Sequence, residues 1–258
     1  MTEKYYLGID IGSSSSKAVI IDGDAKIVGE KIINLGTGSR GPAEVILGAF
    51  EQAGITEVSK TVATGYGRIQ FKDADKQMTE ISCHAKGVKH LVPTAQTVID
   101  IGGQDAKVIR IAPDGKVDNF VMNDKCAAGT GRFLEVMARV LDVKISELSD
   151  LAEKGQSGVT ISSTCTVFAE SETISQLSGG SKIEDIALGS HKSIAEKIVG
   201  LAGRVGLVDD IVMSGGVALN ASVVKAVEEA TGHKIIRVPD PQGAGALGAA
   251  LYARDLDK

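Results

Sequence analysis

The hydrophobic residues of the chain fall into two similar strand-turn-strand patterns. The segment DIGSSSSKAVII begins at Asp10, and the segment DIGGQDAKVIRI begins at Asp100. Their Asp-Ile-Gly and their later lysine align without a gap, apolar residues flank both, and an Asp-Gly dipeptide after each predicts a hairpin. Chance similarity of two strands is the alternative. The repeat predicts two related halves, residues 1–95 and 96–258, divided near the LVPTAQ segment.

Helical patterns fill much of the remaining sequence. In the segment 41–55, a proline near the start and a glycine near the end are typical of helix termini. Apolar residues between Phe133 and Leu141 form one face of a helix. Three further helices are predicted, at 184–206, 220–232 and 244–256. The last is rich in small residues, and we expect it to pack closely against the first half. The alternation with strands predicts an α/β architecture.

Composition and charge narrow the possible partners and location. A chain of 258 residues with 43% hydrophobic content can bury a sizeable core. The net charge of −5, without a basic run interleaved with aromatic residues, argues against nucleic acid and membrane partners. No signal peptide or membrane-spanning segment is recognisable, so we expect a cytoplasmic protein. In that reducing compartment, Cys83, Cys126 and Cys165 are expected to be buried fillers, reactive thiols or metal ligands rather than disulfides.

The glycine-rich and serine-rich turns suggest a phosphate site. The segment GSSSSK at 12–17 lies between two strands, so it predicts a hairpin turn rather than a P-loop, which requires a following helix. Successive small residues expose backbone N–H groups that suit phosphate oxygens, and Lys17 would add a positive charge. Alone, such a turn is usually just solvated. The DIGGQD turn and a third glycine pair, in MSGGVALN at 213–220, favour nucleotide binding. A tight strand-helix turn is the alternative for MSGGV.

These three elements, in this order, resemble the phosphate-1, phosphate-2 and adenosine motifs of the superfamily of actin, sugar kinases and heat-shock chaperone ATPases. The resemblance implies a duplicated actin-like, sugar-kinase-like ATPase fold, with the nucleotide in the cleft between two α/β halves. Asp10 and Asp105 are the candidates for the water shell of a Mg²⁺ ion, and Gln104 for orienting the attacking water or the γ-phosphate. The candidate nucleotide-binding residues are Gly12, Ser13, Ser14, Ser15, Ser16, Lys17, Gly102, Gly103, Gln104, Asp105, Gly215, Gly216, Val217, Asn220 and Gln242.

Longer motifs resemble a narrower family, the activator components of 2-hydroxyacyl-CoA dehydratases. ATPase subunits of benzoyl-CoA reductases and the reductase of double-cubane cluster proteins are similar to it. The resemblance covers nearly the whole chain. Its motifs are LGIDIGSSSSKAVI, ATGYGR, DADKQMTEISCHAKG, VIDIGGQDAKVI, MNDKCAAGTGRFLEVMA, ISSTCTVFAESE, SGGVALN and GALGAALYA.

That resemblance implies a homodimer with one [4Fe-4S] cluster at its two-fold axis. By motif, the ligands from each subunit are Cys126 and Cys165. The sequence spacing alone does not identify them, but two thiolates are half of the set that a cubane needs, and a closed dimer supplies the other half. Each cysteine precedes a predicted helix, whose free N–H groups stabilise anions. Cys83 and His84 are interpreted as structural, because adjacent helical residues point to different faces.

The implied function is ATP-dependent transfer of one electron. A reduced ferredoxin or flavodoxin would be the donor, and an iron-sulfur enzyme such as a 2-hydroxyacyl-CoA dehydratase would be the acceptor. A double-cubane cluster protein and a benzoyl-CoA reductase-type enzyme are alternative acceptors. From other classes, a small-molecule kinase of the same fold and a chaperone-type binding module are the alternatives. The kinase needs a substrate pocket that is commonly built by insertions, for which 258 residues leave little room, and the chaperone type needs a peptide-binding domain that this sequence does not predict.

Overall fold

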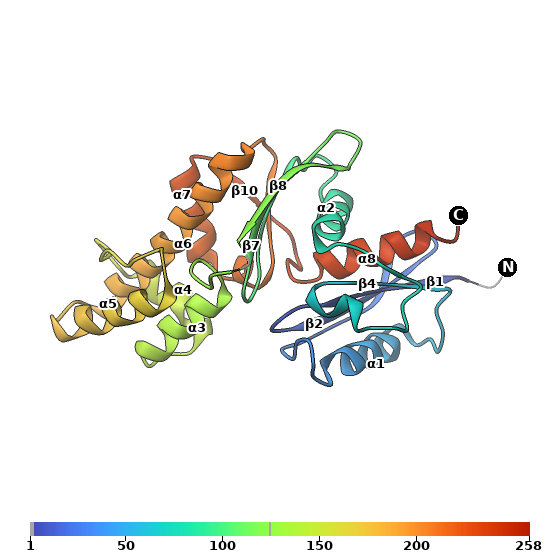
Figure 1. Ribbon diagram of the computed structural model, residues 1–258, viewed down its shortest axis with the longest axis horizontal. Helices are drawn as coiled ribbons and strands as arrows, with labels where there is room; N and C mark the ends of the chain where they lie inside the picture. Colours follow the sequence, from blue (N-terminus) through green and yellow to red (C-terminus); the bar gives the residue numbers. More distant parts are fainter. Residues whose placement is uncertain (1–2, 124) are drawn as a thin grey trace. The chain divides into compact units, whose positions relative to one another are not determined.

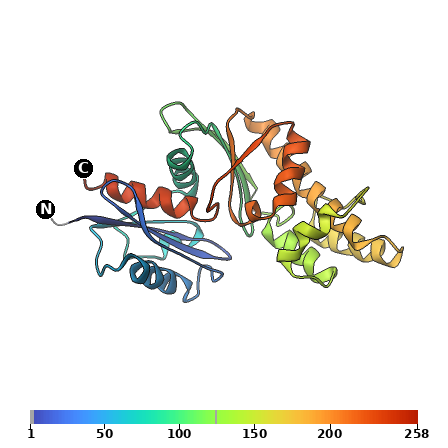
Figure 2. The same ribbon diagram turned by 180° about the vertical axis from the view of Figure 1, so that it is seen from behind.

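The computed structural model describes residues 3–123 and 125–258, which form two units (Figures 1 and 2). Unit 1 runs up to Val98 and also contains Ile111–Asp118 and Val238–Lys258. Unit 2 contains Ile99–Arg110 and Asn119–Arg237. The chain therefore returns to unit 1 at its C-terminal end, where the small-residue helix lies.

Unit 1 is built on a mixed five-stranded sheet. Its strands, in sheet order, are β3 (Ile27–Ile33), β2 (Ser16–Asp22), β1 (Tyr5–Ile11), β4 (Lys60–Thr64) and β5 (Lys76–Gln77). Strands β1, β2 and β3 pair antiparallel, whereas β4 runs parallel to both β1 and β5. The turn GSSSSK therefore lies in a hairpin, as its flanking strand patterns predict.

The sheet of unit 2 repeats this order. It contains β8 (Val117–Asn123), β7 (Ala106–Ile111), β6 (Thr97–Ile101), β9 (Ile211–Ser214) and β10 (Ile235–Arg237), again in sheet order. Each strand thus occupies the place of the strand five positions earlier in the chain. The prediction of two related α/β halves is confirmed by this duplicated topology.

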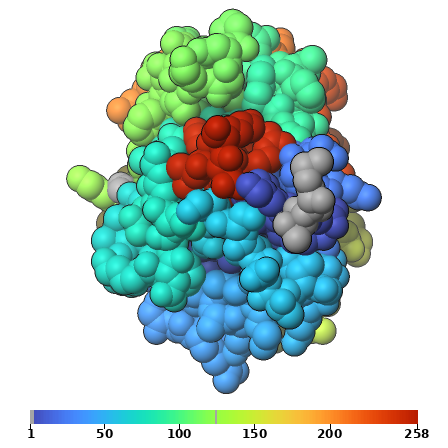
Figure 3. Space-filling view, turned by 90° about the vertical axis from the view of Figure 1, so that its right-hand side faces the viewer, coloured from blue at the N-terminus to red at the C-terminus, as the bar shows by residue number. Residues whose placement is uncertain are grey.

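Helices cover both faces of the sheet in unit 1. Helix α1 (Gly41–Ala53) packs on β2 and β3, while α8 (Ala244–Asp255) packs on β1, β2 and β4 (Figure 1). Strand β1 is buried on both faces, which is why its sequence is a nearly continuous apolar run. The end of α8 reaches the surface of the unit beside the first segments of the chain (Figure 3). Helix α1 ends, as predicted, at a left-handed glycine, Gly54.

Unit 2 carries most of the remaining helices. They are α3 (Gly131–Val140), α4 (Leu148–Glu153), α5 (Thr166–Ser178), α6 (Ile183–Val205) and α7 (Ala221–Thr231), with single turns at η2 (Ile145–Glu147) and η3 (Gly216–Leu219). Unit 1 adds η1 (Tyr66–Ile69) and α2 (Glu80–Leu91). The five helices predicted by range are confirmed as α1, α3, α6, α7 and α8. Within the described residues, no helix is long and apolar enough to cross a membrane.

Helices α2 and α8 approach closely enough for backbone contact. A Cβ atom on Gly248 would lie 1.8 Å from the carbonyl oxygen of Cys83, and one on Gly87 would lie 1.9 Å from that of Ala244. On the other side of α8, a Cβ on Gly8 of β1 would lie 2.0 Å from the carbonyl oxygen of Ala246. The small residues of α8 are therefore a packing requirement of unit 1.

This contact predicts opposite effects for two glycine-to-alanine changes. Gly248→Ala should lower the free energy of unfolding by about 1–3 kcal/mol or more, because backbone must move to admit the methyl group. Gly200→Ala, in α6, meets no atom within 4 Å and should raise it by up to about 1 kcal/mol through helix propensity. Urea denaturation of both variants and the parent measures the difference, and equal stabilities would contradict the packing argument.

His191 is a fully buried histidine on α6. Its Nε2 lies 3.2 Å from Nδ2 of Asn220, whose Oδ1 accepts the N–H of Val223 at the start of α7. Because the amide oxygen is occupied, the amide nitrogen donates and the neutral imidazole accepts. Burial lowers the pKa of His191 from 6.5 to about 4. The ring is therefore neutral in the folded protein near pH 7.

His191 should make the fold sensitive to acid. Between pH 6.5 and about 4 the unfolded chain binds a proton at this residue and the folded chain does not, so stability falls as the pH falls through that window. The full difference corresponds to about 3 kcal/mol of unfolding free energy. Denaturant titrations at several pH values should show a flatter profile for His191→Gln, which keeps an acceptor for Asn220. Parallel profiles in the two proteins would be the contrary result.

Candidate functional site

In unit 1, the turn between β1 and β2 is shaped and supported by backbone contacts. The N–H of Gly12 donates to the carbonyl of Ser15 at 3.0 Å, and the N–H of Thr37 donates to the carbonyl of Gly12 at 2.9 Å. The Ser16 hydroxyl donates to the carbonyl of Leu35 at 2.7 Å. Gly12 to Ser15 stay partly exposed while Ser16 is buried. The turn therefore presents small residues at the surface of unit 1 on a braced backbone.

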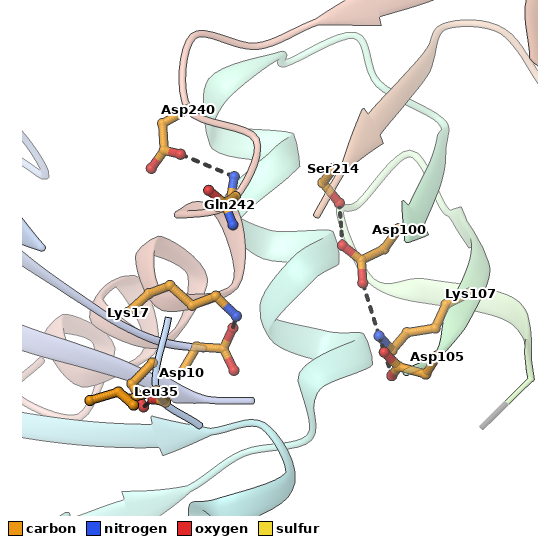
Figure 4. Close-up of polar contacts among 10 residues, drawn as sticks. Asp10, Lys17, Leu35, Asp100, Asp105, Lys107, Ser214, Asp240 and Gln242 are labelled. Atoms are coloured by element: carbon orange, nitrogen blue, oxygen red, sulfur yellow. Dashed lines mark hydrogen bonds and ion pairs between the residues drawn. The ribbon is translucent and has the colours of Figure 1, made fainter. Parts of the chain in front are cut away.

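An ion pair lies directly beneath this turn. Asp10 and Lys17 are cross-strand neighbours, and the Lys17 Nζ lies 3.0 Å from Oδ2 of Asp10 (Figure 4). Asp10 is almost completely buried. Gly65 leaves room for its carboxylate, because a Cβ there would lie 2.4 Å from Oδ1. The positive charge predicted for phosphate binding is thus already paired with a carboxylate.

The corresponding turn of unit 2 encloses a larger charge network. The N–H of Gly102 donates to the carbonyl of Asp105 at 2.9 Å and closes the turn between β6 and β7. The Lys107 Nζ lies 2.9 Å from Asp100 and 2.7 Å from Asp105. The Ser214 hydroxyl donates to Oδ1 of Asp100 at 2.8 Å (Figure 4). Gln104 is the exposed residue of the turn.

The two networks are related by the internal repeat. Asp10 and Lys17 correspond to Asp100 and Lys107, and the positive-φ glycines after β4 and β9 correspond as well. By position, therefore, the counterpart of Asp10 is Asp100, whereas Asp105 takes the place of a serine in the first turn. Sequence reasoning singled out Asp105 and passed over Lys107 and Ser214, although the aligned Asp and Lys of the repeat already contained the signal.

The expected adenosine segment is a tight turn held by the core. Gly215 has a φ of 85°, and a Cβ there would lie 2.3 Å from the carbonyl oxygen of Ile101. Gly216 is exposed, whereas the side chain of Val217 is buried in the hydrophobic core of unit 2. Val217 therefore offers only its backbone to a ligand. Asn220 is half-buried and caps α7 with its side chain.

Gln242 belongs to unit 1, whereas the other candidates for adenosine contact belong to unit 2. It lies in the segment that leads into α8, where its N–H donates to Oδ1 of Asp240 at 3.0 Å (Figure 4). A Cβ on Gly243 would lie 2.1 Å from Oδ2 of the same aspartate. Asp240 therefore orders the backbone at Gln242.

Cys126 and the segment around Cys165 meet in unit 2, although 39 residues separate them. The Sγ of Cys126 lies 3.5 Å from the carbonyl oxygen of Thr164. Both thiols are free and partly exposed. Cys165 directly precedes α5 as its N-cap residue, whereas residues 127–130 separate Cys126 from α3. The carbonyl of Cys126 accepts the side-chain amide of Asn123 at 2.8 Å, which ties the loop to the end of β8.

Cys83 and His84 have a different environment. Both are buried on α2 in unit 1. Burial raises the pKa of the Cys83 thiol to about 12, so it is protonated near neutral pH and unsuited to metal binding. Among residues 3–123 and 125–258, the structure contains no cluster of three or more His, Cys, Asp or Glu side chains arranged to hold a metal ion. Any metal group at Cys126 and Cys165 thus needs further ligands.

Two helices adjacent to the cysteines are joined to each other. Arg139 near the end of α3 lies 2.9 Å from Glu170 on α5, and the buried Thr173 hydroxyl of α5 lies 3.3 Å from the Sδ of Met137 on α3. On the outer side of α5, Val167, Phe168 and Ile174 are exposed. Phe168 keeps 63% of its surface in contact with solvent.

Comparison with known proteins places this arrangement among ATPases and activators. The sequence is 58% identical over 251 residues to the activator of lactoyl-CoA dehydratase from Anaerotignum propionicum, covering 96% of this chain and 97% of that one. The activator of 2-hydroxyisocaproyl-CoA dehydratase from Clostridium difficile has been solved with bound ADPNP. It is 50% identical in sequence with a TM-score of 0.94, and the match covers 98% of this chain and 95% of that one. Component A of the Acidaminococcus fermentans (R)-2-hydroxyglutaryl-CoA dehydratase is 53% identical in sequence, with a TM-score of 0.94, and the match covers 98% of each chain.

More distant structures share the fold alone. A ROK family glucokinase from Streptomyces griseus is 15% identical with a TM-score of 0.59, covering 97% of this chain and 99% of that one. The actin-like, sugar-kinase-like fold is therefore confirmed. Residues 7–253 match the BadF/BadG/BcrA/BcrD ATPase family. The chain, with its repeated glycine-rich and serine-rich hairpin turns and its match across nearly its whole length, belongs to this family of ATPases.

Proposed function

We propose that this chain is an ATP-dependent reductive activator that passes one low-potential electron to an iron-sulfur dehydratase acting on a 2-hydroxyacyl-CoA. The observation that carries the proposal is the contact between Cys126 and Thr164, the residue before Cys165, in a chain of an ATPase family. Relatives named as activators of three such dehydratases supply the acceptor class.

The phosphates of ATP are held, in this proposal, by the two hairpin turns. Each follows a strand of its own unit and presents small, partly exposed residues, whose N–H groups suit phosphate oxygens. Gly12 to Lys17 form the first grip and Gly102 to Asp105 the second. Gly215, Gly216, Asn220 and Gln242, with the backbone of Val217, border the adenosine.

The carboxylates beside the turns suit a hydrated Mg²⁺ ion. In unit 2, Asp100 and Asp105 contribute two negative charges and Lys107 one positive charge, so the buried network is net anionic and attracts a divalent cation. Asp10 of unit 1 is the second candidate. Exposed Gln104 would orient the attacking water. Hydrolysis then needs only positioning and charge stabilisation from these residues, without a covalent intermediate.

The two cysteines fit half of the ligand set of a [4Fe-4S] cluster. Each chain offers two partly exposed thiols, and a second copy related by two-fold symmetry would offer the other two. When bound, the cluster supplies a carrier for one electron. Cys165 lies at the N-terminus of α5, where free N–H groups stabilise a thiolate by about 0.3–1 kcal/mol. A homodimer follows from this count of ligands.

The electron donor would be a small reduced carrier of the ferredoxin or flavodoxin class. Two alternative electron acceptors are a double-cubane cluster protein and a benzoyl-CoA reductase-type enzyme. A small-molecule kinase of this fold would have no use for paired thiols. Iron content and visible absorption of anaerobically purified protein separate the activator from the kinase.

Asp105 tests the nucleotide site. Asp105→Asn should lower Mg²⁺-dependent ATP hydrolysis about 10²-fold or more, because it removes a charge next to the transferring phosphoryl group while nearly keeping the size of the side chain. Phosphate release assays measure the effect on protein that urea denaturation shows to be folded, because Asp105 also pairs with the buried Lys107. Asp114→Asn is the matched control, since Asp114 is exposed and pairs with Lys116 at the surface. Undiminished hydrolysis by Asp105→Asn would remove this carboxylate from the site.

The cysteines test the cluster. Iron should be near two per subunit in the parent, which corresponds to one four-iron cluster per dimer. It should be near zero in Cys126→Ser and in Cys165→Ser, because symmetry removes two ligands at once. Size-exclusion chromatography should show a weakened dimer in both variants, while nucleotide binding survives.

Cys83→Ser is the control for both cysteine variants, and it should keep the iron and the dimer. Full iron in either ligand variant would exclude the shared-cluster arrangement. Four irons per subunit would mean that each chain holds a cluster of its own.

A further inference from the structure

Helix α3 begins directly against the turn Gly102 to Asp105 between β6 and β7, which we call the phosphate-2 turn after its proposed role. The N–H of Gly131 donates to the carbonyl of Gly102 at 2.9 Å, and the N–H of Arg132 donates to the carbonyl of Gly103 at 2.8 Å. First-turn N–H groups have no partner within a helix and are usually satisfied by the side chain of the N-cap residue. Here the N-cap residue, Thr130, accepts no such bond. The carbonyls of the turn cap the helix instead.

The Thr130 hydroxyl points to two carbonyl groups. Its Oγ1 lies 3.1 Å from the oxygen of Gly103 and 2.7 Å from the oxygen of Ala127, and the residue is fully buried. A hydroxyl has one hydrogen, so it donates fully to only one of these oxygens at a time. Gly103 belongs to the turn, and Ala127 follows Cys126. One buried hydroxyl thus connects the turn with the cysteine loop.

The chain between Cys126 and α3 is short and constrained. The N–H of Thr130 donates to the carbonyl of Ala127 at 3.1 Å, which closes a four-residue turn. Gly129 has a φ of 83°, and a Cβ there would lie 2.8 Å from the stem of Lys197. The loop therefore has little freedom to absorb a displacement of the helix start.

The turn and the helix are also tightly packed, so that a methyl group at the start of the helix would displace the turn by a few tenths of an ångström. A Cβ on Gly131 would lie 3.2 Å from the carbonyl oxygen of Gly102 and 3.3 Å from the Cα of Gly103. Such packing allows small shifts of one segment only if the other moves with it.

We propose that Thr130 is a positioning residue that transmits the state of the phosphate-2 turn to Cys126. The proposal rests on the function proposed above, which places nucleotide phosphates at Gly102 to Asp105 and a metal group at Cys126. A nucleotide that contacts the turn shifts the carbonyls of Gly102 and Gly103, and the hydroxyl redistributes its hydrogen between Gly103 and Ala127. The hydroxyl thus has two arrangements, one donating to Gly103 and one donating to Ala127. A ligand at the turn and a group at Cys126 would each favour one of them.

Thiol reactivity tests this coupling without the metal group. The full-length chain, freed of metal and reduced, is treated with iodoacetamide, with and without Mg²⁺ and the non-hydrolysable nucleotide ADPNP. Peptide mass spectrometry gives the alkylation rates of Cys126 and Cys165 separately. Calorimetric titration of the same preparations gives the affinity for ADPNP. The parent should bind ADPNP and show a several-fold change in the rate at Cys126.

Three variants separate the coupling from general structural damage. Thr130→Val removes the hydroxyl and keeps the branched shape, so it should bind ADPNP but lose the nucleotide-dependent change at Cys126. Thr130→Ser should restore the change. Thr173→Val removes another buried threonine hydroxyl that contacts α3, at Met137, and should leave the change intact. Gly131→Ala should displace the turn and so reduce the nucleotide-dependent change in alkylation rate at Cys126. This variant provides the test if Thr130→Val does not fold.

The outcomes distinguish the two proposals. Absence of ADPNP binding by the parent would overturn the nucleotide site and this coupling with it. Binding without any change at Cys126 in the parent, or a full change in Thr130→Val, would overturn the coupling alone. Loss of the change in Thr173→Val as well would show that α3 responds to any loosening, and would remove the special role of Thr130.

Discussion

The ammonium group of Lys107 lies between the carboxylates of Asp100 and Asp105 in the interior of unit 2, and the surrounding fold depends on this contact. Only 3% of the Lys107 side chain is exposed. A charge at such depth is tolerated only when it is paired and hydrogen-bonded, and removal of one partner typically costs about 3–5 kcal/mol. The network joins the end of β6, the start of β7 and, through Ser214, the end of β9. It thereby fixes the place from which the phosphate-2 turn projects.

The two units support their first hairpin turn in the same way but continue differently after it. In unit 1, the carbonyl of Gly12 accepts the N–H of Thr37, in the segment that leads to α1. In unit 2, the carbonyl of Gly102 accepts the N–H of Gly131, in the segment that follows Cys126. The support of a turn by the chain after the third strand is thus common to both halves. Duplication explains the scaffold, and the inserted cysteine loop distinguishes the second half.

Local patterns predicted those features that depend on local physics. The repeat, the hairpin at 12–17 and α1 with Gly54 at its end follow from alternation, turn chemistry and left-handed glycine. Helix α5 has no clear amphipathic pattern, because Val167, Phe168 and Ile174 lie on its exposed side. Its position after Cys165 was the available signal.

Contacts between segments that are distant in the sequence could not be predicted from local patterns. The contact between Cys126 and Thr164 spans 38 residues, and only family resemblance paired the two cysteines in advance. The sharing of Lys107 by two carboxylates depends on side-chain directions at a turn. The bonds from α3 to Gly102 and Gly103 depend on how a helix meets a hairpin, which no residue pattern encodes. The nucleotide residues themselves stay predictions.

The packing of α8 on the first sheet sets an order in which the chain can complete its structure. One core of unit 1 combines Tyr6, Val19 and Ile21 with Leu247 and Leu251. These strand residues are synthesised more than 200 residues before their apolar partners on α8. The whole of unit 2 comes between them in the sequence. During synthesis the β1–β2 hairpin therefore holds one apolar face open to water, or to a chaperone, until α8 has left the ribosome.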